Sequence, residues 1–158
     1  MRNLLPLAAL LCFATPRTLP AQSAVSFQAG VMTAESHHAL EVGVRVSPAQ
    51  ANTVGFGFSL DAVPDWQHVL LGLTDVSVIG TIGLVRDVRL ELRAGGSIMF
   101  GVGGGGALAL GYHLGAGMVA DLTGPVGLRA DYTWRHLRGF FEESLPLPSL
   151  TIGVVLQP

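Results

Sequence analysis

The chain has 158 residues, of which 49% are hydrophobic and 13% charged, with a formal net charge of −2. This length allows one domain. The nine basic residues are all arginines, face eleven acids and form no basic patch, which excludes a nucleic-acid partner. Cys12 is the only cysteine and falls in the leader described next, so we expect no disulfide, no metal and no cofactor in the rest of the chain.

Residues 1–21 have the pattern of a secretory signal peptide. Arg2 precedes an apolar run at 4–14, and Pro20 and Ala21 follow it. A positive start, an apolar stretch of about 7–15 residues and a small residue at the cleavage site are typical of such peptides. The run is too short to cross a bilayer, which needs about 20 residues. We therefore predict cleavage after Ala21 and a mature domain at 22–158.

The remainder of the chain alternates between apolar and polar or glycine residues. In the fifth segment Leu90 and Leu92 alternate with Arg89, Glu91 and Arg93, which predicts a strand with one apolar and one charged face. The segments have about 9–11 residues, the length of a tilted membrane-spanning strand, whereas strands of soluble proteins average about 5–6. In chain order the segments are 23–33, 38–47, 53–61, 74–84, 88–97, 107–120, 126–135 and 149–157.

The connectors between these segments also alternate, in length. Short turns are expected at 48–52, 85–87 and 121–125, and longer loops at 34–37, 62–73, 98–106 and 138–148. Short turns at one end and long loops at the other are typical of outer-membrane barrels. The fold class predicted is all-β, an eight-stranded antiparallel up-and-down transmembrane β-barrel with both termini on one side.

The charged faces are predicted to line the lumen, and the apolar faces to meet lipid. Many glycines share the charged face, and on a water-exposed sheet they would pack nothing and leave few charges for solubility. The lumen of an eight-stranded barrel is just wide enough to be filled by side chains, so arginines and carboxylates can pair across it. Asp61 and Asp75 are expected to complete the charge balance. The predicted lumen network is Glu41, Arg45, Arg89, Glu91, Arg93, Arg129, Asp131 and Arg135.

Two aromatic residues lie late in the seventh segment, next to a predicted long loop. Tyr132 and Trp134 share a face with Leu128, which we expect to meet lipid. Aromatic side chains gather at the membrane–water interface of such barrels. We interpret both residues as lipid-interface aromatics; the alternative is two aromatic residues in a soluble core.

Residues 22–158 resemble the small eight-stranded outer-membrane barrels, the OmpA-like and OmpX-like family. The resemblance rests on the leader, on the period-two repeats at 88–97 and 126–135, and on the unequal lengths of the connectors. The resemblance implies the outer membrane of a Gram-negative-type bacterium, with membrane lipid and the barrel assembly machinery as partners. It also implies a structural or adhesion-like, non-catalytic role, with long loops that contact an extracellular ligand. The chain departs from the family at its end, where Gln157 and Pro158 replace the usual terminal aromatic residue.

Three smaller patterns have ordinary explanations. Residues 101–106 contain G-x-G-x-x-G, but a dinucleotide site needs a following helix, and the sequence after it alternates like a strand, which predicts a hairpin loop. His37 and His38 are adjacent, so on a strand they point to opposite faces and do not chelate one ion. His113 is expected to face the lumen and to hydrogen-bond an acid.

Two other functions remain open from the sequence. His136, Glu142, Glu143 and Ser144 supply the groups of acyl-ester hydrolysis, so a lipid A-modifying acyl hydrolase is one alternative. Lipid A deacylases among the small barrels have the histidine and serine two apart on one strand, whereas Arg138 occupies that position here. The other alternative is a soluble secreted barrel that binds a small apolar ligand.

Overall fold

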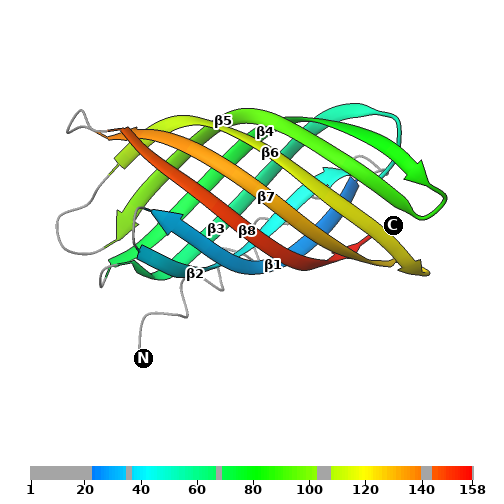
Figure 1. The fold of residues 1–158 in the computed structure, drawn as a ribbon, viewed down its shortest axis with the longest axis horizontal. Coiled ribbons are helices and arrows are strands. Elements are labelled where there is room, and N and C mark those ends of the chain that lie inside the picture. Colours follow the sequence, from blue (N-terminus) through cyan, green and yellow to red (C-terminus); the bar gives the residue numbers. More distant parts are fainter. Residues whose placement is uncertain (1–22, 35–36, 67–68, 103–107, 140–143, 158) are drawn as a thin grey trace.

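The computed structural model describes residues 23–34, 37–66, 69–102, 108–139 and 144–157. They form a closed barrel in which each strand pairs antiparallel with its sequence neighbour and β8 pairs with β1 (Figure 1). This confirms the predicted all-β, eight-stranded up-and-down fold. No helix in these ranges is long and apolar enough to cross a membrane. The strands are β1 Ser23–Ala34, β2 His37–Pro48, β3 Val54–Trp66, β4 Val69–Val85, β5 Val88–Val102, β6 Leu108–Thr123, β7 Val126–Gly139 and β8 Ser144–Leu156.

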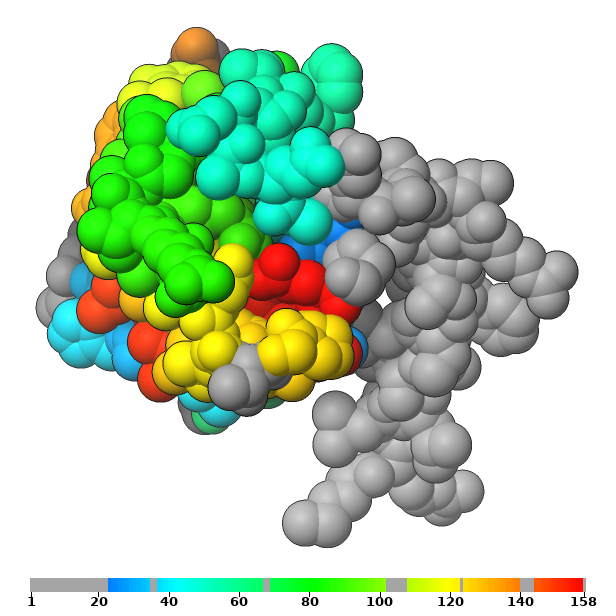
Figure 2. Space-filling view, turned by 90° about the vertical axis from the view of Figure 1, so that its right-hand side faces the viewer, coloured from blue at the N-terminus to red at the C-terminus, as the bar shows by residue number. Residues whose placement is uncertain are grey.

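The barrel has one end with tight turns and one end where the strands run on. The β2–β3, β4–β5 and β6–β7 turns share an end with the start of β1 and the end of β8 (Figure 1, and end-on in Figure 2). At this end Gly124, with φ of +61°, takes the left-handed conformation that the two-residue β6–β7 turn requires. We call the end with these tight turns the turn end, and the opposite end the projecting end.

The prediction of long loops at the projecting end is wrong for most of their length. Strand β3 continues to Trp66 and β4 begins at Val69, so only 67–68 separates them. Strands β5, β7 and β8 likewise continue into the predicted loops at 98–106 and 138–148. The strands persist because their alternation persists: Val63 and Leu73 point inward there and are fully buried. The two ends therefore differ in strand length more than in loop length.

The outer wall is apolar around the middle of the barrel. Phe56, Leu114 and Leu128 are 80%, 51% and 50% exposed in the isolated chain, and large apolar side chains cover the outer face of all eight strands. A soluble barrel would bury these side chains, and exposed apolar area of this extent is a membrane-facing surface. This surface argues against the soluble ligand-binding alternative.

The interior also contains an apolar cluster that the sequence patterns did not predict. It fills the interior of the projecting end and is formed by residues close to the strand ends there. A smaller group, Ala24, Val119 and Val155, lies inside the turn end. The residues between these two groups are mostly polar or charged. The apolar cluster comprises Met32, Ala34, Val63, Leu71, Leu73, Met99, Ala109, Leu137 and Leu147.

Candidate functional site: the charged layer inside the barrel

The middle of the interior holds what we call the charged layer. All eight residues of the predicted lumen network lie on the inner wall, and none is more than 5% exposed. They come from β2, β5 and β7, and carboxylates from β3 and β4 join them. The layer comprises Glu41, Arg45, Arg89, Glu91, Arg93, Arg129, Asp131 and Arg135, together with Asp61 and Asp75.

Arg135 is the centre of one half of the charged layer. Its Nη1 lies 3.1 Å from the Glu41 carboxylate, and its Nη2 lies 2.9 Å from Asp61 and 2.9 Å from Asp75. Nη1 also donates to the Ser149 hydroxyl at 3.1 Å. Arg135 is 0% exposed, so its charge is compensated by these groups instead of by water. One guanidinium thus links strands β2, β3, β4 and β8 to β7.

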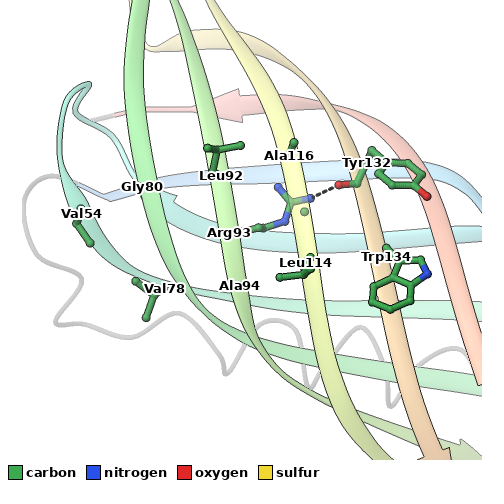
Figure 3. Close-up of a pocket in the computed structure, with 11 residues that line it drawn as sticks. Val54, Val78, Gly80, Leu92, Arg93, Ala94, Leu114, Ala116, Tyr132 and Trp134 are labelled. Atoms are coloured by element: carbon green, nitrogen blue, oxygen red, sulfur yellow. Dashed lines mark hydrogen bonds between the residues drawn. The ribbon is translucent and has the colours of Figure 1, made fainter. Parts of the chain in front are cut away.

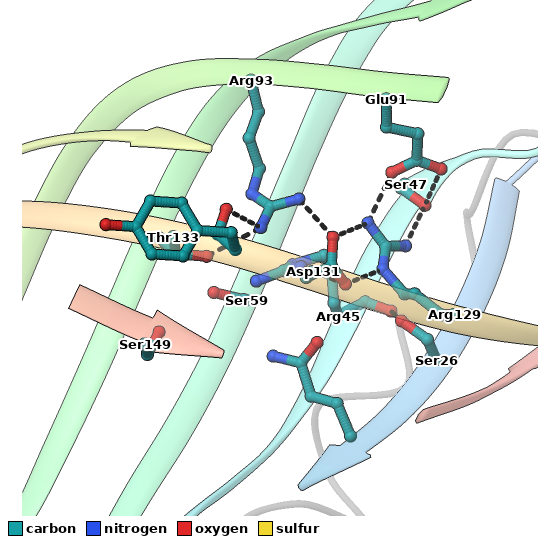
Figure 4. Close-up of polar contacts among 12 residues, drawn as sticks. Ser26, Arg45, Ser47, Ser59, Glu91, Arg93, Arg129, Asp131, Thr133 and Ser149 are labelled. Carbon is teal, nitrogen blue, oxygen red and sulfur yellow. Dashed lines mark hydrogen bonds and ion pairs between the residues drawn. The ribbon is translucent and has the colours of Figure 1, made fainter. Parts of the chain in front are cut away.

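Asp131 is the centre of the other half (Figure 4). Arg45 Nη1 lies 3.0 Å from its carboxylate and Arg93 Nη1 lies 2.6 Å from it, while Arg129 Nε donates to it as well. Arg129 Nη2 also contacts Glu91 at 2.5 Å. A single carboxylate therefore receives arginines from β2, β5 and β7, and Glu91 offsets part of the excess positive charge.

Glycines leave the room that these side chains occupy. A Cβ at Gly43 would collide with the Asp61 carboxylate, and one at Gly117 would collide with the Asp131 carboxylate. At Gly115 a Cβ would lie 2.6 Å from Arg93 Nε. The glycines that weaken each strand by itself are therefore what allows the long charged side chains to lie flat against the inner wall.

The charged layer ends toward the turn end at a more exposed pair. Arg89 Nη1 donates to both Asp121 carboxylate oxygens, at 2.9 and 3.1 Å, and the Asp121 side chain is 40% exposed. Gln157 also donates to Asp121, at 2.5 Å. Since water reaches this carboxylate, the pair contributes less to stability than the pairs deeper in the barrel.

His113 is buried on the inner wall, between two hydroxyls. Its Nε2 lies 2.8 Å from Ser77 Oγ, and its Nδ1 lies 2.9 Å from Ser97 Oγ. Ser97 donates to Asp75 at 2.6 Å. The expected bond between His113 and an acid is thus relayed through a serine, and the Nδ1–Asp75 distance is 3.7 Å.

On the outer wall, Tyr132 and Trp134 point away from the lumen. Trp134 belongs to a ring cluster with two residues the aromatic prediction did not include: its ring centroid lies 5.8 Å from Tyr112 and 5.6 Å from His136. The Tyr112 and His136 centroids are 5.3 Å apart. The register places Tyr112 directly opposite His136, which is why rings from neighbouring strands meet.

The remaining candidate residues form no compact catalytic or metal site in the described part of the chain. His136 pairs with Pro146 across β7 and β8, and Ser144 pairs with Arg138. Glu142 and Glu143 lie outside the described residues. No group of three or more potential metal ligands occurs among the residues described.

The histidine pair and the glycine-rich motif both lie at strand ends. His37 and His38 begin β2, with His38 Nδ1 3.0 Å from the Thr33 hydroxyl and the His37 ring 6.3 Å from that of Trp66. The G-x-G-x-x-G motif joins β5 to β6, and its residues 103–106 are outside the described ranges. A strand and not a helix follows it, so it lacks the element a dinucleotide site needs.

No protein-family model matches the chain, and no curated protein matches its sequence. Its fold is similar to solved barrels. Neisserial surface protein A matches with a TM-score of 0.65 and 17% identity, over 86% of this chain and 97% of that one. The N-terminal barrel domain of Pseudomonas aeruginosa OprF matches with 0.59 and 18%, over 85% and 98%. Ail, the attachment invasion locus protein of Yersinia pestis, matches with 0.57 and 10%, over 85% and 95%. The chain has the fold of the small eight-stranded outer-membrane barrels.

Proposed function

We propose that this protein is a non-catalytic outer-membrane barrel of a Gram-negative-type bacterium, with a structural or adhesion-like surface role and a lumen plugged by the charged layer. The observation that carries the proposal is the distribution of polarity: ion-paired side chains line the inside, and apolar side chains cover the middle of the outer wall. In water this arrangement is unfavourable, whereas in a bilayer it satisfies both faces.

A plug fits the charged layer better than a pore. Five arginines meet five carboxylates within the layer, so its formal charges cancel, and an eight-stranded lumen is just wide enough to be filled by side chains. Ion-conducting barrels have more strands. We therefore assign the layer to stability, and expect purified protein in planar bilayers to give no steady ion conductance.

The projecting end is the part proposed to contact the exterior. Its strands extend past the apolar middle of the outer wall, and it lies opposite the end where β1 begins and β8 ends. The similar Yersinia barrel is named as an attachment protein and has been crystallised with the heparin analogue sucrose octasulfate, which supports a surface-interaction role by analogy alone. An extracellular ligand would meet the connectors at this end.

Export and assembly follow from the same proposal. Residues 1–21 would direct the chain through the inner membrane and be removed, and the barrel assembly machinery would insert 22–158 beside membrane lipid.

Membrane extraction followed by gel electrophoresis tests the proposal as a whole. The protein should sediment with outer membranes, require detergent for release and change its gel mobility after boiling, because the folded barrel resists unfolding in detergent. Cells that express it should attach to a sulfated-polysaccharide surface more than deletion cells do. Recovery in the soluble periplasm would refute the membrane assignment, and equal attachment would refute the adhesion-like role.

A lipid A-modifying hydrolase remains the second candidate because one observation favours it. His136 and Ser144 both lie on the outer wall near the projecting end, on the neighbouring strands β7 and β8. A hydrolase requires loss of lipid-modifying activity in His136→Ala and Ser144→Ala. An unchanged lipid A profile in a deletion strain would exclude it.

A further inference from the structure

The outer wall contains an apolar groove that the charged layer does not explain. The groove has a volume of about 780 Å³ and crosses strands β3 to β7 (Figure 3). Small-molecule sites enclose roughly 300–1,000 Å³. Its lining includes the small residues Gly80, Ala94 and Ala116 and the large Leu114 and Trp134, and Arg93 of the charged layer also reaches it. A hollow of this size on a wall otherwise covered by large side chains can hold an apolar chain.

The groove arises from small residues set beside large ones. Gly80 is paired with Leu92, Ala94 with Leu114, and the register repeats this alternation across β4, β5 and β6. A Cβ at Gly80 would meet no atom within 4 Å, so the space above it is open. The hollow is therefore formed by the choice of residues on three neighbouring strands, and filling one of them would close part of it.

One end of the groove leads to a cationic and aromatic patch. Trp134 lines the groove and also contacts the rings of Tyr112 and His136. Arg138, four residues beyond Trp134 on the same face of β7, lies roughly 13 Å further along the strand and is exposed. Among the arginines of the described strands, Arg138 is the one that lies on the outer wall; the other five are buried inside.

The chemistry of this patch selects an anionic headgroup. An outward arginine is unfavourable in the middle of a bilayer but costs little near the interface, where headgroups surround it. A guanidinium binds phosphate oxygens in a bidentate, charge-assisted geometry, and Trp and Tyr rings prefer the headgroup level. Arg138 above a ring cluster and an apolar groove thus matches a phosphate above an acyl chain.

We propose that this outer-wall site binds one acyl lipid with a phosphate-bearing headgroup, from the leaflet at the projecting end. The acyl chain lies over Gly80, Ala94 and Ala116, and the phosphate meets Arg138 with His136 beside it. The proposal requires only that the barrel spans a membrane, so it holds or fails separately from the adhesion-like role.

Tryptophan quenching by brominated lipid tests the site. The chain has two tryptophans, so Trp66→Phe leaves Trp134 as the reporter. The protein is placed in phosphatidylcholine nanodiscs that contain a small fraction of chain-brominated phosphatidylglycerol or, separately, chain-brominated phosphatidylcholine. At equal fractions we expect the anionic lipid to quench Trp134 at least twofold more. Ala94→Leu and Arg138→Gln should each remove that excess.

Matched variants separate the site from the general lipid annulus. Ala29→Leu adds the same bulk to the outer face of β1, outside the groove, and Arg86→Gln removes an exposed arginine from the β4–β5 turn at the other end. Both should keep the excess quenching. Heat-modifiable mobility verifies folding of each variant, and Ala116→Leu replaces Ala94→Leu if the latter does not fold. Equal quenching by the two lipids, or an excess that survives either site variant, would overturn the proposal while leaving the barrel assignment intact.

Discussion

The charged layer and the apolar cluster occupy different parts of the same barrel interior, and the outer wall around them differs in polarity. In the charged layer, Arg135 and Asp131 are buried behind an outer wall of apolar side chains. In the apolar cluster, Leu137 and Leu147 are buried behind an outer wall that carries polar groups. Polar residues on that part of the outer wall include Thr33, His38, Arg138 and Ser144.

This difference shows where the surroundings of the barrel change. Next to lipid, the apolar side chains belong outside and the charges inside. Past the lipid, the ordinary rule for soluble proteins returns, and apolar residues fill the core. Strand β7 makes the change within three positions, from Arg135 inward to Leu137 inward and Arg138 outward. We therefore place the membrane boundary of β7 near His136.

Removing the centre of the charged layer should have the largest effect. Arg135→Leu leaves Glu41, Asp61 and Asp75 without their shared cation, and breaking a buried ion pair costs about 3–5 kcal/mol. Equilibrium unfolding in urea with lipid vesicles measures the loss. Arg138→Leu is the matched control, because it deletes the same side chain from the outer wall. Equal stability of the two variants would contradict a structural role for the charged layer.

Arg129→Leu tests the other half of the same layer. It removes the cation closest to Glu91 and one of the three arginines that contact Asp131. Since Arg45 and Arg93 still contact Asp131, we expect a smaller loss than for Arg135→Leu, at the lower end of about 3–5 kcal/mol. The folded band on a gel should disappear at a lower temperature than for the unmodified chain. A normal heat shift would count against the assignment.

A truncation in the apolar cluster should destabilise by a different mechanism. Leu137→Ala opens a cavity beside Leu147, and such changes cost about 2–5 kcal/mol. The loss should be nearly independent of salt, because no charge is involved. Leu128→Ala removes the same side-chain atoms from the lipid-facing wall of β7 and should cost less. Similar losses for the two would mean that the projecting end has no core of its own.

The smallest effect is expected at the exposed edge of the charged layer. Asp121→Asn removes the carboxylate that Arg89 contacts near the turn end, and exposed ion pairs are worth about 0.2–1 kcal/mol. Salt should reduce this difference further, since it screens a pair that water reaches. Urea unfolding at low and high salt measures both. A loss comparable to that of Arg135→Leu would show that the layer acts as one unit.

The sequence predicted the fold well because the fold depends on period two, and the same period puts the predicted charged residues on one face of each strand. In β5 the alternation of Arg89, Glu91 and Arg93 with leucines defines two faces, whatever the neighbouring strands are. The apolar cluster was missed because Leu71 and Leu73 lie in predicted loops, where glycine and proline nearby weaken the strand signal. Leu137 follows the inward-facing Arg135 by two residues, so continuing the same alternation along the strand predicts that Leu137 also faces inward.

The sequence by itself determined that alternate residues face opposite sides, that eight such strands occur, and which side chains share a face. These properties are local, since successive Cβ atoms on a strand point in opposite directions. Only the tertiary structure decided that Arg135 meets carboxylates from three other strands, that the Tyr112 ring contacts Trp134 edge-to-face, and that small residues on neighbouring strands form one groove. Those contacts depend on register and barrel closure, which join residues far apart in the chain.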